Sequence, residues 1–149
     1  SQRIGMLALT GEIVGALEGL LRERGVTAEV TGSEMHADAD PGQVTRALRN
    51  LLTNAIQHSP HGGAVRVGLT RGATVEVRIT DEGAGIAEED QPFVFERFYR
   101  ADRSRSRSAG SGIGLTVARE LIAANGGAVE VESTGATGTT FRVDLPLAL

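Results

Sequence analysis

Four polar side chains follow one another at helical spacing in the middle of the chain. In steps of i, i+4, i+7 and i+8 they are Asn50, Asn54, Gln57 and His58. This spacing places all four near one face of a helix. Amide oxygens suit a hard cation such as Mg²⁺, and a histidine there could contact a phosphate or stack on a base. A solvated helix face is the alternative, and the four residues alone do not decide between the two.

A carboxylate stands at the end of a strand-like segment, immediately before two nearby glycines. Asp81 could accept a hydrogen bond from an exocyclic amine, while Gly83 and Gly85 would let a flat base approach the backbone. An ordinary turn is the competing interpretation, because turns favour the same residues. A dinucleotide-binding G-x-G-x-x-G motif is disfavoured, since its third glycine would fall at Glu88.

A second glycine run precedes another predicted helix. Gly110, Gly112 and Gly114 would expose backbone N–H groups at a helix N-terminus, an arrangement that suits phosphate. The alternative is a flexible loop before an ordinary helix.

An arginine-rich segment adjoins this glycine run. Residues 97–108 contain five arginines and one aspartate, and arginine suits phosphate because it can bond it in a bidentate way. Phe95, Phe98 and Tyr99 stand at its start, as an anchor for a lid would. The alternative is a solvated basic loop.

The surrounding pattern predicts the elements that would position these residues. A helix is expected near 9–23, a second from the Asp40-Pro41 start to before Pro60, and a third over 112–125. Strands are expected at 27–31 and 34–37 around a turn, and as hairpins at 64–70 with 74–81 and at 128–133 with 139–145. A short helical piece is expected near 92–98. This order predicts a two-layer α/β sandwich, in which three helices cover one face of a mostly antiparallel mixed sheet.

Composition removes several classes of function. The 149 residues contain no cysteine and no lysine, which excludes disulfide scaffolds, cysteine metal sites, Walker-type P-loops and Schiff-base chemistry. The net charge of −4 argues against nucleic-acid binding as the main activity. We expect one soluble domain over 1–149, because no apolar run approaches the length of a membrane span and no export signal is evident.

Five segments, taken in order, resemble one family. N-L-L-T-N-A-I-Q-H-S at 50–59 is similar to the N box of two-component sensor histidine kinases, and D-E-G-A-G-I at 81–86 to their first glycine box. F-E-R-F-Y-R at 95–100 resembles their F box, G-S-G-I-G-L at 110–115 their second glycine box, and G-T-T-F-R-V-D-L-P at 138–146 their closing strand. The resemblance covers about residues 8–147. It implies the catalytic ATP-binding domain shared with gyrase-type topoisomerases, heat-shock chaperones and mismatch-repair ATPases.

The resemblance also implies roles for individual residues. Asp81 would recognise the adenine amine, Asn54 would hold Mg²⁺, and residues 87–111 would form a flexible ATP lid. Asn50, near the phosphates, and Arg100, at the terminal phosphate, are the expected catalytic residues. The expected contacts to ATP are Asn54, Gln57, His58, Asp81, Gly83, Gly85, Ile86, Phe98, Tyr99, Gly110, Gly112, Ile113, Gly114, Leu115 and Thr140.

Two departures from the family pattern bear on the activity. Gln57 stands where many members carry a lysine or arginine toward the phosphates. Asn50 stands where the ATPase relatives carry a glutamate that activates water, and an amide cannot act as a base. The second departure favours phosphoryl transfer over hydrolysis.

The resemblance implies a kinase whose acceptor lies elsewhere. None of His36, His58 and His61 lies in a segment like H-E-L-R-T-P, so we expect the acceptor domain before Ser1 or in another chain. The expected partners are the dimerisation domain of the parent protein and a response-regulator receiver domain. The fragment is expected to be monomeric and to be the cytoplasmic part of a membrane-anchored sensor. The alternatives are an anti-sigma-factor-type serine kinase and a degenerate nucleotide-binding module.

Overall fold

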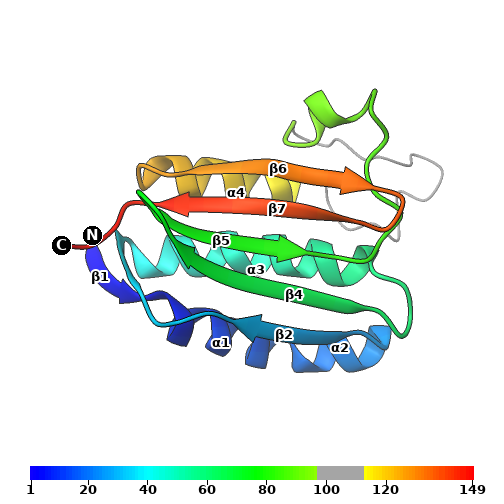
Figure 1. The fold of residues 1–149 in the computed structure, drawn as a ribbon, viewed down its shortest axis with the longest axis horizontal. Helices are drawn as coiled ribbons and strands as arrows, with labels where there is room; N and C mark the ends of the chain where they lie inside the picture. The colour runs from blue at the N-terminus through cyan, green and yellow to red at the C-terminus, as the bar shows by residue number, and fades with distance from the viewer. Residues whose placement is uncertain (97–112) are drawn as a thin grey trace.

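Helices cover one face of a five-stranded sheet in the computed structural model, which describes residues 1–96 and 113–149 (Figure 1). The helices among the described residues are α1 (Met6–Ala16), α2 (Glu18–Arg24), α3 (Pro41–His58), α4 (Ile113–Ala124) and the 3₁₀ turn η1 (Gln91–Phe93). The strands are β1 (Gln2–Gly5), β2 (Thr27–Thr31), β3 (His36–Ala39), β4 (Ala64–Arg71), β5 (Val75–Thr80), β6 (Ala128–Gly135) and β7 (Gly138–Leu145). The expected two-layer α/β sandwich is confirmed.

The expected number of helices was wrong, because the helix predicted near 9–23 is two helices. The helical backbone is interrupted at Leu17, whose φ and ψ are −97° and 8°. Leu17 itself is buried, and glycines at positions 15 and 19 flank it. Because glycine is a poor helix former, this stretch bends readily, and α1 and α2 together follow the edge of the sheet.

The sheet is mixed, with the strand order β2-β4-β5-β7-β6. β2 pairs with β4 in parallel, and the other three pairings are antiparallel. The strands expected at 27–31 and 34–37 around a turn are β2 and β3, which do not pair with each other. β3 pairs instead with β1, a strand that the sequence did not predict, in a separate two-stranded sheet. β2 finds its partner in β4 only after α3 has crossed over the sheet, a pairing that local patterns do not indicate.

α3 is the helix that carries the polar row. Its start follows the sequence prediction, since the side chain of Asp40 accepts the N–H of Gln43 at 3.0 Å and Pro41 occupies the first turn. One side of α3 is buried against the sheet and neighbouring helices through Val44, Ala47, Leu48, Leu51, Leu52, Ala55 and Ile56. The amides therefore lie on the remaining, partly exposed side.

α3 and α4 pack side by side and are joined at one end by Asn125. Its Oδ1 accepts the N–H of Asp40, and its Nδ2 donates to Oε1 of Gln43, both at 2.8 Å. α4 is shorter than α3, so the start of α4 lies beside the middle of α3, at Asn50 (Figure 1). None of the helices in the described part of the chain has the length and apolarity needed to cross a bilayer.

Candidate functional site

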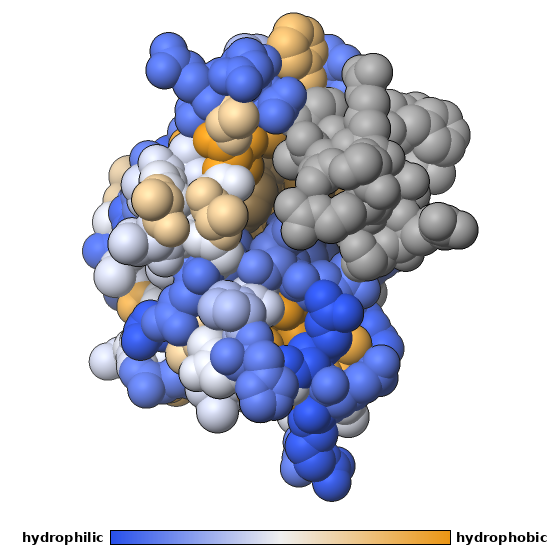
Figure 2. Space-filling view, turned by 90° about the vertical axis from the view of Figure 1, so that its right-hand side faces the viewer, coloured by the Kyte–Doolittle hydropathy of each residue, from blue (hydrophilic) through white to orange (hydrophobic). Residues whose placement is uncertain are grey.

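Several chain segments that carry described residues of the predicted site meet at one end of the molecule (Figure 1). The last turn of α3, the turn after β5 and the β6–β7 hairpin all reach this end. Figure 2 looks onto it and shows a mainly hydrophilic surface with a smaller apolar area in its upper half. We first describe the carboxylate at the centre of this arrangement.

Asp81 is only 4% exposed and is held mainly through one of its two carboxylate oxygens. Oδ1 accepts the N–H of Gly83 at 2.9 Å and the N–H of Thr139 at 3.2 Å. The backbone N–H of Asp81 donates to the carbonyl of Thr139 at 2.9 Å. Among the described residues, no donor bonds Oδ2. This oxygen is therefore the acceptor that remains for a bound molecule.

Burial raises the pKa of Asp81, and the N–H groups of Gly83 and Thr139 lower it by less. The charge of His58 acts in the same direction as these two donors. A buried carboxylate with a raised pKa, next to a histidine, is typical of a binding or catalytic site.

The turn that follows Asp81 is fixed from both sides. On the α3 side, the N–H of Glu82 donates to Oγ of Ser59 at 3.3 Å, and a Cβ at Gly83 would overlap the carbonyl of His58. On the hairpin side, Gly85 has a φ of 86° and lies so close to the backbone of Gly135 that a side chain would not fit. The two glycines that the sequence singled out are thus required by close backbone approach.

The amide face of α3 meets the start of α4. Nδ2 of Asn50 donates to the carbonyl of Gly114 at 3.3 Å, and both residues are partly exposed. Outside its own helix, a Cβ at Gly114 would meet no atom of the described residues within 4 Å. The structure therefore brings the N box and the described end of the second glycine box together, as the resemblance implied. Asn54 and Gln57 lie on the same helix and are also partly exposed.

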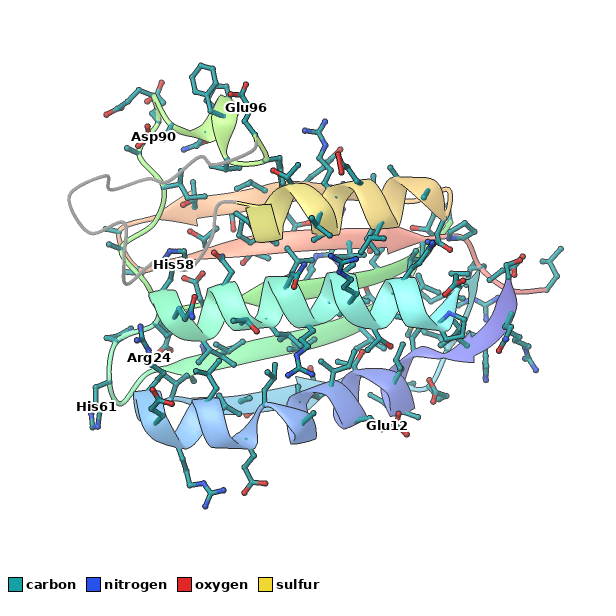
Figure 3. The ribbon with its side chains drawn as sticks, turned by 180° about the vertical axis from the view of Figure 1, so that it is seen from behind. Glu12, Arg24, His58, His61, Asp90 and Glu96 are labelled. Carbon is teal, nitrogen blue, oxygen red and sulfur yellow. The ribbon has the colours of Figure 1, made fainter. Side chains whose placement is uncertain are left out.

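His58 is the last residue of α3, and its charge interacts with Asp81. It is exposed to solvent, yet desolvation by the surrounding protein lowers its pKa, and the charge of Arg24 lowers it further. Asp81 and a hydrogen bond with the backbone of Asn54 oppose these effects. Figure 3 shows Arg24 near the end of α3 with His58, whereas the exposed His61 lies against Gly25, which follows α2. The net effect favours the neutral imidazole.

Thr140 does not reach Asp81. Its hydroxyl pairs with the hydroxyl of Thr80 at 2.8 Å, on the sheet face opposite the helices. The neighbouring Thr139 is 4% exposed and bonds Asp81 through its backbone N–H and carbonyl. Sequence reasoning missed Thr139, although alternation along 139–145 puts it on the same side as the buried Phe141.

Of the other residues expected to contact ATP, some pack against the core and some lie outside the described residues. Leu115 and Ile86 are partly buried and pack against the core. Phe98, Tyr99, Arg100, Gly110 and Gly112 lie outside the described residues, as does the side chain of Ile113.

Phe95 shows how the segment before residue 97 is attached. Its ring meets that of Phe141 edge-on at 5.9 Å between centroids, and the guanidinium carbon of Arg119 lies 5.3 Å from its centre. Its carbonyl accepts the hydroxyl of Thr116 at 2.5 Å. The anchoring role expected for Phe95 therefore has a physical basis in β7 and α4.

The donor set bears on the kind of metal that could bind. Within residues 1–96 and 113–149 there is no cluster of three or more His, Cys, Asp or Glu side chains able to hold a metal ion. Asn54 offers a partly exposed amide oxygen on α3. This fits Mg²⁺, which takes few protein oxygens and completes its coordination with phosphate and water.

A model of one protein family matches most of the chain. Residues 39–149 match the family described as histidine kinase-, DNA gyrase B-, and HSP90-like ATPase. The chain belongs to this ATPase family. Membership of this family supports the use of ATP by this chain.

Within this ATPase family, the similar proteins include sensor histidine kinases. The sensor-like histidine kinase SenX3 of Mycobacterium tuberculosis is 44% identical over 116 residues, which is 76% of this chain. The solved structure of the mycobacterial sensor histidine kinase MprB is 31% identical with a TM-score of 0.82, over 98% of this chain and 97% of that one. The full-length structure of ShkA in complex with AMPPNP is 26% identical with a TM-score of 0.84, over 99% of this chain and 31% of that one. The chain spans 28% of the length of SenX3.

Proposed function

We propose that this chain binds Mg-ATP and donates its γ-phosphoryl group to a histidine in a separate dimerisation domain of its parent protein. The observation that carries the proposal is the state of Asp81. Its Oδ1 is occupied by two backbone N–H groups, and its Oδ2 remains available in a buried place. Oδ2 would accept the 6-amino group of adenine, a charge-assisted hydrogen bond that guanine, with its carbonyl at that position, does not offer.

The phosphates would lie between the amide face of α3 and the start of α4. Asn50 bonds the carbonyl of Gly114 there, so the backbone of the second glycine box adjoins the N box. ShkA has been solved with AMPPNP, an ATP analogue, on the same fold. Gly110 and Gly112, and Arg100 at the terminal phosphate, remain part of the proposal on sequence grounds alone.

Asn54 is the residue proposed to hold Mg²⁺ through its amide oxygen. When bound, Mg²⁺ would neutralise charge on the phosphates during transfer. The contribution of this chain is to keep the amide oxygen on the exposed side of α3, a position fixed by burial of the opposite side of the helix.

The reaction proposed is transfer rather than hydrolysis. An imidazole nitrogen of the acceptor histidine would attack the γ-phosphorus in line. The bond from that phosphorus to the β–γ bridging oxygen would break, and ADP would leave. Asn50 cannot take a proton from water, which disfavours hydrolysis. The sensor histidine kinases among the similar proteins support this choice over a serine kinase.

The setting of the domain is also part of the proposal. Residues 1–149 would form one catalytic domain that is monomeric by itself. The acceptor histidine would lie in the dimerisation domain of the parent protein, and the phosphoryl group would pass on to a response-regulator receiver domain. The domain would act on the cytoplasmic side of a membrane-anchored sensor.

Calorimetric titration with Mg-ATP and Mg-GTP tests the binding site. We expect adenine-selective binding, weakened about ten- to a hundredfold in Asp81→Asn because a charge-assisted hydrogen bond is lost. Asp38→Asn is the matched control, since Asp38 is exposed in β3 at the other end of the molecule. Equal affinity of the wild type and Asp81→Asn for ATP would rule out the adenine role.

Incubation with radiolabelled ATP tests the transfer. We expect no label on this chain alone, and acid-labile label on the dimerisation domain of the parent protein when the two are mixed. Label on this chain alone would contradict the proposed acceptor. ATP binding without transfer to the added domain would indicate a degenerate binding module.

A further inference from the structure

The β6–β7 hairpin holds both ends of the turn that carries Asp81. At the first end, the backbone of Thr139 bonds Asp81 twice, through its N–H and its carbonyl. At the other end, Oγ1 of Thr134 accepts the N–H of Ile86 at 2.8 Å. The hydroxyls of Thr134 and Thr139 lie 2.7 Å apart and bond each other. One pair of threonines thus joins the two ends of the turn.

The backbone of Thr139 makes two of these four contacts, and those two would survive a change of its side chain. The hydroxyl of Thr134 differs, because it bonds the turn directly through a side-chain atom. The same hydroxyl bonds the side chain of Thr139, the residue next to the carboxylate. Its removal would release the N–H of Ile86 and break the hydroxyl pair with Thr139.

An irregularity in β6 directs the side chain of Thr134 toward the turn that follows Asp81. Val131 pairs with Phe141 and Ser133 with Thr140, so Glu132 is an extra residue on β6. Successive strand side chains point to opposite faces, and one extra residue reverses the alternation. In a regular register counted from the Val131–Phe141 pair, Ser133 would stand opposite Thr139. Because of the extra residue, Thr134 stands opposite Thr139 instead.

Ion pairs on the open sheet face hold the extra residue. The carboxylate of Glu132 bonds Nε of Arg78 at 2.8 Å and Nη1 of Arg142 at 3.3 Å. Arg78 comes from β5 and Arg142 from β7, and these two strands are neighbours in the sheet. Glu132 therefore stabilises the irregular part of β6 on the open face of the sheet. On the opposite face, the same irregularity places Thr134 next to Thr139.

We propose that Thr134 is a positioning residue for nucleobase selection, which holds the turn so that Oδ2 of Asp81 faces the amino group of adenine. This inference rests on the proposed function. Thr134 is not itself among the expected contacts to ATP and acts through Ile86, which is one of them, and through Thr139. Its loss would therefore affect discrimination between bases more than binding of the phosphates.

A set of conservative variants isolates the hydroxyl. Thr134→Val removes it with little change of shape, and Thr134→Ser keeps it while removing the methyl group. Thr80→Val is the matched control, because it removes one member of the hydroxyl pair between Thr80 and Thr140 on the open face. For each protein, the dissociation constants of Mg-ATP and Mg-GTP are measured by calorimetry, and exchange of the Ile86 amide proton is followed by NMR.

The expected result is specific to one variant. Thr134→Val should reduce the preference for ATP over GTP by roughly three- to tenfold, the fold-change expected for one lost hydrogen bond. Its Ile86 amide should exchange faster. Thr134→Ser should restore the preference, and Thr80→Val should keep it. An unchanged preference in Thr134→Val, or equal loss in Thr134→Ser, would overturn the inference.

The same titrations separate this inference from the proposed function. A wild-type chain without preference for adenine would overturn the proposed function and this inference together. A selective wild type with an equally selective Thr134→Val variant would overturn only the role of Thr134. A loss of preference in Thr80→Val as large as in Thr134→Val would also contradict it, because the effect would then be general to hydroxyl pairs of the sheet.

Discussion

Arg24 donates a hydrogen bond from Nη2 to the main-chain carbonyl of Gln57 at 2.8 Å, which joins the end of α2 to the last turn of α3. The last carbonyls of a helix lack partners within it, and a cation is favourable there. The charge of Arg24 also lowers the pKa of His58. A residue that belongs to none of the sequence motifs therefore supports the site from the far side of α3.

Replacement of Arg24 by methionine should raise the pKa of His58, because one of the two causes that lower it is removed. Unfolding should also become easier by about 1 kcal/mol through loss of the hydrogen bond. An NMR titration of the histidines and urea denaturation measure the two effects. Arg22→Met is the control, since Arg22 is exposed and pairs with Glu18 on its own helix. An unchanged pKa in Arg24→Met would contradict this assignment.

Asp81→Asn should unfold less readily than the wild type at neutral pH, although it binds ATP less well. The pKa of Asp81 is raised in the folded state, chiefly by burial. Protonated Asp81 therefore contributes fully to the free energy of unfolding below its ordinary pKa of 3.8. This contribution is lost as the pH rises through the raised pKa. Urea denaturation at pH 7 and near pH 3 should show an advantage of the variant that shrinks in acid. A variant less stable than the wild type at pH 7 would show that its hydrogen bonds outweigh burial.

The sequence predicted the central elements of the fold better than it predicted the edge of the fold. The helix from Asp40, the two hairpins and the helix that ends near Asn125 were confirmed, because strong periodicity and end signals coincide there. β1 and the partner of β3 were missed, since their pairing joins residues 2–5 to residues 36–39 and leaves no local pattern. The position of Thr139 was missed because the resemblance pointed to the next residue. The contacts of Thr134 depend on an irregular strand that no composition signal reveals.

Glu34 supplies a cap for α1 from a distant part of the chain. Its carboxylate accepts the N–H groups of Leu7 at 2.7 Å and Ala8 at 3.2 Å, while Gly5, the residue at the helix start, has no capping side chain. Partial desolvation raises the pKa of Glu34, but these bonds and one from Met35 outweigh it and hold the pKa below its usual value.

Glu34→Gln should lower the free energy of unfolding by about 1 kcal/mol at pH 7, within the range for lost helix caps. The contribution of Glu34 is present above the ordinary pKa of 4.5 and is lost as the pH falls through the lowered value. The difference between variant and wild type should therefore vanish in acid. Glu29→Gln on β2 serves as control, because Glu29 is exposed. A difference that persists below pH 3 would contradict the capping role.

Thr10→Val should stabilise the protein. Thr10 is fully buried in α1, and its hydroxyl has no hydrogen-bond partner among the described residues. An unpaired buried hydroxyl costs about 1–3 kcal/mol, and valine has nearly the same shape. Thermal denaturation should show a higher midpoint for Thr10→Val. Thr10→Ser keeps the hydroxyl and leaves a gap, so its midpoint should fall; a lower midpoint for Thr10→Val would refute the prediction.

The two ends of the chain are bonded to the same strand, β3, far from the Asp81 turn (Figure 1). β1 pairs with β3 along its length, and the N–H of Asp38 donates to the carbonyl of Pro146 just after β7. Mechanical tension applied between the ends would therefore be borne by the hydrogen bonds of β3. Those bonds would break before force reached the strands that carry Asp81 and Thr139, so the site is insulated from pulling on either end.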